Sequence, residues 1–279
     1  MEIGIFAKTY IRPSVDATLD AVAAHGLSTV QFNLSSVGLP TLPDAIDPGI
    51  VTSIRTAFEE RRMTMAAISG TFNMIHPDRR MRAAGLRRLG VLASICNDLG
   101  AKVITLCTGT RAPDNMWSAH PDNQSPAARR DLVATLERAL LYAEQYDLTL
   151  AIEPELNNVV NTAEEARRLL AVFETPRLRV VIDAANLILP IKLPSMAAIL
   201  DEAFNLLGSY IVLAHAKDLS RNGVSGSTAP GQGELDFDCY LGLLARSGYN
   251  GALIMHGLDE SQVPASIAFV RKKLAVTGA

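Results

Sequence analysis

Eight short apolar runs recur along this chain, and several of them end abruptly at a polar residue. The clearest is Thr149–Glu153, which stops at a carboxylate followed by a proline. Apolar runs of this length, bounded by turn residues and separated by helix-like segments, are typical of parallel strands that are buried on both faces. The eight predicted strands are Glu2–Ala7, Thr29–Leu34, Thr64–Ser69, Lys102–Cys107, Thr149–Glu153, Arg179–Asp183, Ile211–His215 and Ala252–His256.

Helix-like segments alternate with these strands, and several end at a glycine such as Gly26, Gly100 or Gly248. Eight strand–helix units in a chain of 279 residues give about 35 residues per unit, which suits a (β/α)8 TIM barrel. The alternative, a doubly wound open sheet, usually has a glycine-rich turn after its first strand, and 7–10 is not such a turn. We therefore expect one α/β domain, a single TIM barrel spanning 1–279.

Four of the predicted strands end at a side chain that can bind a metal ion or move a proton: Glu153, Asp183, His215 and His256. In a TIM barrel the carboxyl ends of all strands lie at one rim, where active sites are built. Carboxylates and imidazoles together suit one divalent cation, such as Mn²⁺, Co²⁺, Zn²⁺ or Mg²⁺. The sequence therefore predicts a metal site at this rim, with Mn²⁺ as the expected ion.

Three phrases give the chain a more specific resemblance: Ala-Ile-Glu-Pro-Glu at 151–155, Val-Ile-Asp-Ala-Ala-Asn at 181–186 and Leu-Ala-His-Ala-Lys-Asp at 213–218. In order and position they resemble the xylose-isomerase-like TIM barrels, a superfamily of sugar isomerases, ketose 3-epimerases, inosose dehydratases and endonuclease IV. The resemblance covers nearly the whole chain and implies that Glu153, Asp183 and His215 bind the metal. It also implies that Arg221, six residues after His215, contacts the hydroxyl groups of the substrate.

The chain departs from this family at the end of its last strand. The family usually has a glutamate there, which binds the metal and, in epimerases, transfers a proton, whereas this chain has His256. An imidazole can fill the ligand position and can accept a proton. The resemblance implies a metal-dependent isomerase or epimerase of a small sugar, sugar phosphate or hydroxy-keto compound, acting through an enediolate. Glu153 or Glu155 would remove the proton from carbon, and His256 would return it.

The same fold allows other functions. An inosose-dehydratase-like lyase begins with the same proton abstraction and then expels a hydroxyl group. A barrel that binds a sugar and a metal without catalysing a reaction is a further alternative, because His256 in place of the glutamate could have abolished the activity. The endonuclease class is disfavoured, since it needs three metals and Asn186 stands where one of its ligand histidines is expected.

Candidate substrate contacts follow several of the predicted strands. His76 and His120 each open a His-Pro-Asp phrase, which is either the punctuation before a helix or a pair of imidazoles over the barrel mouth. Trp117, the only tryptophan, either packs its ring on the C–H face of a sugar or pins its loop. The remaining candidates for hydroxyl recognition are Lys8, Asn157 and Asn186.

Composition predicts the cellular compartment and the partners of the protein. A net charge of −3 without a basic stripe argues against a nucleic-acid partner. Three cysteines without paired spacing suggest a reducing compartment, and no run approaches the ~20 apolar residues of a membrane span. We therefore expect a cytoplasmic protein that acts on a small carbohydrate, without a nucleic-acid or membrane partner. A homo-oligomer is compatible with the sequence.

Overall fold

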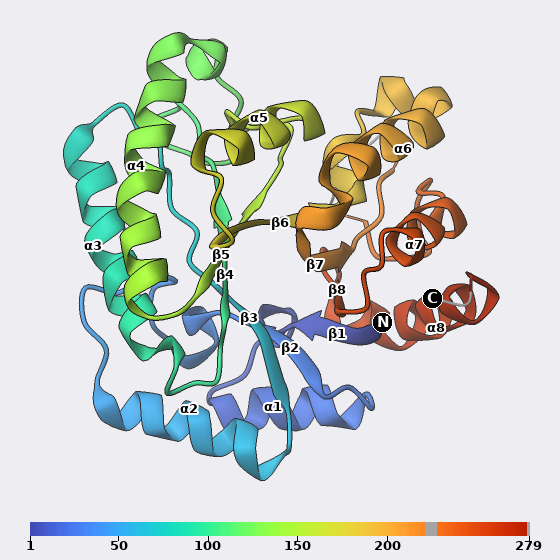
Figure 1. Ribbon diagram of the computed structural model, residues 1–279. Coiled ribbons are helices and arrows are strands. Elements are labelled where there is room, and N and C mark those ends of the chain that lie inside the picture. Colours follow the sequence, from blue (N-terminus) through green and yellow to red (C-terminus); the bar gives the residue numbers. More distant parts are fainter. Residues whose placement is uncertain (221–227, 278–279) are drawn as a thin grey trace.

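The computed structural model describes residues 1–220 and 228–277 (Figure 1). Within these residues, eight parallel strands close into a barrel in chain order, because the last strand pairs with the first. The strands are β1 (Glu2–Phe6), β2 (Thr29–Phe32), β3 (Thr64–Ser69), β4 (Val103–Cys107), β5 (Thr149–Glu153), β6 (Leu178–Asp183), β7 (Ile211–Ala216) and β8 (Ala252–Met255). The predicted TIM barrel is confirmed, and the predicted strand ends differ from these bounds by at most two residues.

A helix follows each strand, and the helices surround the barrel in Figure 1. They are α1 (Val15–Ala24), α2 (Pro48–Glu60), α3 (Arg79–Cys96), α4 (Pro126–Gln145), α5 (Ala163–Phe173), α6 (Met196–Leu207), α7 (Phe237–Arg246) and α8 (Val263–Thr277). Short 3-10 helices lie in the connections: η1 (Ala7–Thr9), η2 (Leu34–Val37), η3 (Pro121–Gln124), η4 (Ala184–Leu187), η5 (Pro190–Ser195), η6 (Gly208–Tyr210) and η7 (Glu260–Gln262). No helix of the described residues combines the length and apolarity needed to cross a bilayer.

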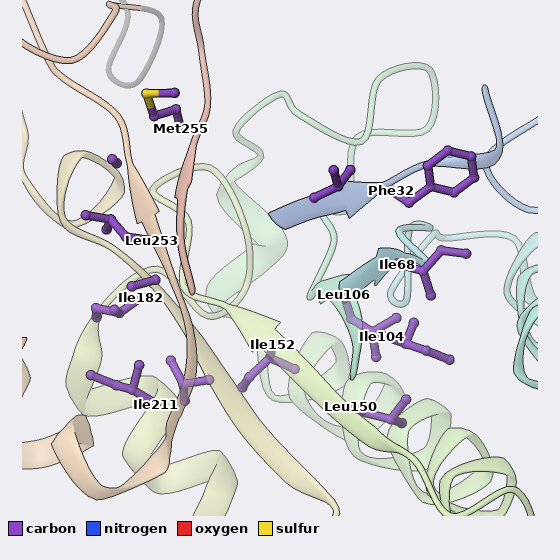
Figure 2. Packing of buried hydrophobic residues seen from close by; sticks show 14 of the residues in the cluster. Phe32, Ile68, Ile104, Leu106, Leu150, Ile152, Ile182, Ile211, Leu253 and Met255 are labelled. Carbon is purple, nitrogen blue, oxygen red and sulfur yellow. The ribbon is translucent and has the colours of Figure 1, made fainter. Parts of the chain in front are cut away.

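The larger apolar layer lies between the strands and the surrounding helices. Figure 2 shows part of it, with side chains contributed by successive strands, including Ile104, Leu150, Ile152 and Ile182. These residues alternate along each strand with residues that face the barrel interior, since successive side chains of a strand point to opposite sides. Burial of both faces explains why the strands are nearly continuous apolar runs.

A second, smaller apolar cluster fills the barrel interior. It comprises Phe6, Ala67, Ala151, Val181, Leu213 and Ile254. Two residues further along a strand, the side chain returns to the same face and stands one level higher in the barrel. On β5 to β8 that step leads from the interior cluster to Glu153, Asp183, His215 and His256. The strand period therefore carries all four side chains to the carboxyl-terminal mouth of the barrel.

Candidate metal centre

Three of the predicted ligands come together at this mouth. Asp183, His215 and His256 each offer one ligand atom, and these atoms all lie within 4.8 Å of one another. Strand pairing explains the arrangement, because Asp183 on β6 and His215 on β7 are partners in the parallel ladder. The backbone N–H of His256 donates to the carbonyl of Ala216, which extends the pairing of β7 and β8 to this residue. The three side chains thus stand on adjacent strands at one level.

The same three side chains carry buried polar atoms that make no hydrogen bond. These atoms are Asp183 Oδ2, His215 Nδ1 and His256 Nδ1. Asp183 Oδ2 nevertheless lies 3.0 Å from the Lys217 ammonium and 3.4 Å from His215 Nδ1, so part of its charge is compensated within the protein. Three such atoms without a hydrogen bond in one cluster are suited to a bound ion, because buried polar atoms are nearly always hydrogen-bonded. One carboxylate oxygen and two imidazole nitrogens are suitable ligands for Zn²⁺, Co²⁺ or Mn²⁺. The residues of this group therefore fit a divalent cation.

Glu153, the fourth predicted ligand, lies beside this group. Its Oε1 atom is 3.4 Å from His215 Nδ1 and accepts a hydrogen bond of 2.6 Å from Asn186 Nδ2. Asn186 in turn accepts a 2.9 Å hydrogen bond from Lys217 Nζ, which is also 3.0 Å from Asp183 Oδ2. A chain of contacts thus runs from Asp183 through Lys217 and Asn186 to Glu153. Asn186, predicted as a substrate contact, is engaged in orienting this carboxylate.

The imidazole of His215 is oriented from the opposite side of the barrel. Its Nε2 atom lies 2.8 Å from Gln31 Oε1, and the amide nitrogen of Gln31 faces Ser69 Oγ at 3.3 Å and Thr105 Oγ1 at 3.4 Å. Because the amide nitrogen is engaged with these hydroxyls, the oxygen of Gln31 faces His215 and accepts its Nε2 hydrogen. Nδ1 then faces Asp183 and Glu153, and once it has lost its proton its lone pair is directed toward them, as metal binding requires.

Charges around the centre shift the protonation of its members. Burial alone would lower the pKa of His215, but the Glu153 and Asp183 carboxylates raise it to about 9. Burial would raise the pKa of Asp183, yet the Lys217 ammonium and His215 hold it below its ordinary value. The pKa of His256 is well below its ordinary value because of burial and the positive charges of Lys217 and His215. His256 is therefore neutral, whereas His215 must lose a proton when a cation binds.

Glu155 stands two residues beyond Glu153, in the turn that follows β5. Burial and the charge of Glu153 raise the pKa of its carboxyl group to about 7. Its backbone N–H donates to Val160 O, and its carbonyl accepts from Asn158 N, so the turn that carries it is fixed by hydrogen bonds. Glu155 is close enough to the centre to experience the charges of Asp183 and Lys217.

The three polar residues of the His-Ala-Lys-Asp segment at 215–218 have different roles. His215 and Lys217 face the centre, whereas Asp218 holds the following loop. The Asp218 carboxylate accepts hydrogen bonds from the backbone N–H groups of Leu219, Gly231, Gly233 and Leu235. A Cβ at Gly233 would lie 2.4 Å from Asp218 Oδ1, so the close approach requires glycine. The loop leads into α7, where Asp236 accepts a hydrogen bond from Cys239 N at the start of the helix.

Two predicted substrate contacts, His76 and His120, fix their own turns. His76 Nδ1 accepts from the backbone N–H of Asp78, and the Nε2 atom lies 3.1 Å from Pro113 O. His120 Nδ1 accepts from Asp122 N at the start of η3. The structure therefore assigns both His-Pro-Asp phrases a local role before a helix, and contact with substrate remains a prediction for each.

The other predicted contacts lie at the rim. The Trp117 side chain is exposed, and its carbonyl accepts a 3.0 Å hydrogen bond from Asn157 Nδ2, which ties the loop after β4 to the turn after β5. Lys8, in η1, places its Nζ atom 4.5 Å from the ring centroid of Phe6. Arg221 lies outside the described residues. The substrate-binding roles of Trp117, Asn157, Lys8 and Arg221 remain predictions.

Sequence reasoning missed Gln31 and Lys217 as members of the site. Gln31 interrupts an apolar strand with a polar side chain, and the two-residue period would have directed it to the same face as the predicted ligands. Lys217 follows His215 by two residues, so the same period applies. Both residues are at least 95% buried. A buried polar residue in phase with a ligand is therefore the signal that could have found them.

Comparison with known proteins places this fold among related barrels. A family model described as xylose isomerase-like TIM barrel matches residues 19–273. A D-tagatose 3-epimerase-like protein is similar in structure, with a TM-score of 0.79, 14% identity, and coverage of 100% of this chain and 98% of that one. An L-ribulose 3-epimerase has a TM-score of 0.75 at 15% identity, covering 100% of this chain and 96% of its own.

An IolI protein solved with a zinc atom is also similar, with a TM-score of 0.75, 16% identity, and coverage of 99% of this chain and 98% of that one. No curated protein sequence matches the chain. At these identities the solved structures establish the shared fold alone. The family model, however, covers residues 19–273, which include β2 to β8 and the candidate ligands of the site. The chain therefore belongs to the xylose isomerase-like TIM barrel family.

Proposed function

We propose that this protein is a metal-dependent isomerase or epimerase of a small sugar, sugar phosphate or hydroxy-keto compound. The observation that carries the proposal is the set of three buried atoms without a hydrogen bond, Asp183 Oδ2, His215 Nδ1 and His256 Nδ1, which converge beside the Glu153 carboxylate. A cation site next to a carboxylate is the arrangement needed to remove a proton from a carbon adjacent to a carbonyl group. The similarity to sugar epimerases in fold supports the same reaction class.

Asp183, His215 and His256 would hold the divalent ion, with Glu153 as a further ligand. The ion would supply positive charge against the negative charge that develops on the substrate oxygens. Gln31 keeps the His215 ring in the orientation that presents Nδ1, and Asn186 keeps Glu153 Oε1 in place. These contacts hold the chain's own side chains in the reactive arrangement before substrate arrives, which lowers the reorganisation that the reaction needs.

Glu153 is the proposed base that takes the proton from carbon. His256 and Glu155 are the proposed groups for its return. In the closed barrel β6 and β7 separate β5 from β8, so Glu153 and His256 approach the mouth from different directions. An epimerase needs proton transfer on two faces of a planar enediolate, and groups on separated strands meet that requirement. An isomerase needs one group that serves both carbons, for which Glu153 alone suffices.

Exchange of solvent deuterium into a panel of ketoses tests the proposal. The protein, loaded in turn with Mn²⁺, Co²⁺, Zn²⁺ or Mg²⁺, is expected to incorporate deuterium at a carbon adjacent to the carbonyl. Glu153→Gln should reduce the exchange at least about hundredfold, because general base catalysis commonly contributes that much. Glu137→Gln, which alters an exposed glutamate on α4, serves as the matched control and should exchange like the wild type.

The same assay separates the alternatives. Exchange with loss of water from the substrate would replace the proposed reaction by that of a lyase. Metal and sugar binding without exchange by any member of the panel would contradict an isomerase or epimerase and leave a binding barrel. Full exchange by Glu153→Gln would show that Glu153 is not the base.

A further inference from the structure

Lys8 lies over the ring of Phe6, and Phe6 in turn contacts His256 in the candidate metal centre. Its ammonium nitrogen is 4.5 Å from the ring centroid of Phe6. The Phe6 ring lies 5.2 Å from that of His256, and the His256 ring lies 5.3 Å from that of His215. The ammonium of Lys8 therefore lies over an aromatic face beside the centre.

Lys8 has no carboxylate partner among the described residues. The other cations near this mouth are paired: Lys217 lies 3.0 Å from Asp183 Oδ2, and Arg12 lies 2.5 Å from Glu260 Oε1. No described carboxylate oxygen comes within 4.0 Å of the Lys8 ammonium, and this includes Asp259, which lines the same cavity. An ammonium group in this position can bind an anion without first breaking a protein ion pair.

The cavity beneath Lys8 opens onto the metal centre. Its volume is about 460 Å³, and its lining includes Lys8, Thr9, His256 and Gly257. Lys8 is accessible to solvent through this cavity. Partial burial in the barrel mouth nevertheless lowers the pKa of Lys8, and the charge of Lys217 lowers it further, whereas the charge of Glu153 raises it. A ligand that fills the cavity therefore contacts both Lys8 and His256. A group bound at Lys8 would belong to the same molecule that reaches the centre.

A bound cation would remove the negative charge that otherwise opposes an anionic ligand. The carboxylates of the centre are Glu153, Glu155 and Asp183, the cavity adds Asp259, and the ammonium groups belong to Lys8 and Lys217. Fully ionised, these groups leave two net negative charges, which a divalent ion would neutralise. A neutral His256 after β8 contributes to this balance, because a glutamate there would leave the site negative.

We propose that the substrate carries a carboxylate or phosphate group that pairs with Lys8, at the end of the molecule remote from the reacting carbons. The inference rests on the proposed function and narrows its substrate class to compounds that carry an anionic group. Attraction between an ammonium and an anion strengthens as the substrate excludes water from the cavity. The pairing also fixes which end of the substrate faces the metal centre.

Three ketoses that differ in one substituent test this inference. D-Fructose, D-fructose 6-phosphate and D-fructuronate share a carbon skeleton and carry a hydroxyl, a phosphate or a carboxylate at C6. In deuterium exchange by the metal-loaded protein, we expect kcat/KM for at least one anionic ketose to exceed that for D-fructose at least tenfold. The anionic ketose with the larger kcat/KM identifies the preferred anion as phosphate or carboxylate. A preference for D-fructose would overturn the inference.

Variants of Lys8 then locate the effect. Lys8→Met should lose at least tenfold more kcat/KM on the preferred anionic ketose than on D-fructose, chiefly through KM, and Lys8→Arg should restore most of the loss. Lys192→Met, at an exposed lysine in η5, is the matched control and should leave the preference intact. Equal losses on neutral and anionic ketoses in Lys8→Met would contradict the pairing.

Binding decides the inference even if no ketose undergoes exchange, a result that would refute the proposed function alone. Calorimetric titration of the zinc-loaded protein would compare dihydroxyacetone, dihydroxyacetone phosphate and glycerate. At least tenfold tighter binding of one anion, lost in Lys8→Met, supports the inference. Equal affinities of the wild type and Lys8→Met for both anions would overturn it.

Discussion

The two halves of the barrel bring different polar side chains to its interior. The strands β5 to β8 end in Glu153, Asp183, His215 and His256, which are ionisable and face the centre. The strands β2 to β4 carry Gln31, Ser69 and Thr105, which are uncharged and linked by hydrogen bonds. One contact, from His215 to Gln31, crosses between the halves. One half therefore carries the candidate ligands, and the other orients one of them.

This division has a physical advantage. Buried charges that face one another are costly until a cation binds, whereas a buried network of neutral groups satisfies itself. A hydrogen bond contributes about 0.5–1.5 kcal/mol net, so Gln31 can orient His215 without a large effect on folding. The ligands on β5 to β8 instead depend on a bound ion to compensate their burial. Substitutions in the two halves should therefore have different effects on metal binding, and four predictions test that difference.

The largest effect is expected for Asp183→Ala. It removes a buried ligand oxygen, so metal affinity should fall at least about hundredfold and bound metal should drop well below one equivalent in elemental analysis. Asp131→Asn is the matched control from outside the ligand set, since Asp131 pairs with Arg82 and Arg111 behind the loops after β3 and β4. It should lower the midpoint of thermal unfolding and leave the metal content at the wild-type level. Undiminished metal in Asp183→Ala would remove this residue from the centre.

His256 distinguishes this chain from the usual family pattern and should show the next effect. His256→Gln removes the imidazole nitrogen, and we expect metal affinity to fall by about tenfold to hundredfold because the amide is a weaker ligand. His256→Glu should retain binding and shift the preference from Zn²⁺ and Co²⁺ toward Mn²⁺ and Mg²⁺, since a carboxylate is a harder ligand. Competition titrations with a chelating indicator measure both affinities. An unchanged affinity in His256→Gln would show that His256 does not bind the ion.

Gln31 is the test of the orienting half. Gln31→Leu removes the acceptor for His215 Nε2, so the ring can turn and change its tautomer, and metal affinity should fall by about tenfold. Imidazole nitrogen chemical shifts in NMR spectra would report the tautomer directly. Thr29→Val is the matched control on β2, because the Thr29 hydroxyl is buried and makes no hydrogen bond. Equal metal affinity and an unchanged His215 tautomer in Gln31→Leu would contradict the division between the halves.

The same division explains how much the sequence could predict. Glu153 and Asp183 were identifiable because each is a charged residue at the end of an apolar run. The eight apolar runs themselves predicted the barrel. Gln31 lies inside its run, and its importance depends on a partner 184 residues away that only the closed barrel brings near. The His-Pro-Asp phrases left two interpretations, because capping a turn and facing the mouth require the same residues. Only the hydrogen bonds of His76 and His120 assign them to their turns.

The smallest expected effect concerns the loop after β4, where Trp117 is held through its backbone. Asn157 Nδ2 donates to the Trp117 carbonyl, and Trp117 N donates to Asn115 Oδ1, so the exposed ring takes no part in these hydrogen bonds. If the ring packs on substrate, Trp117→Ala should raise KM about two- to tenfold with little change in metal content, as expected for one aromatic contact. Trp117→Phe should restore most of that loss. Asn157→Ala would loosen the loop while the ring remains, and its comparison with Trp117→Ala separates loop fixation from contact. Loss of thermal stability in Trp117→Ala with unchanged KM would make the ring a structural element and remove it from the candidate substrate contacts.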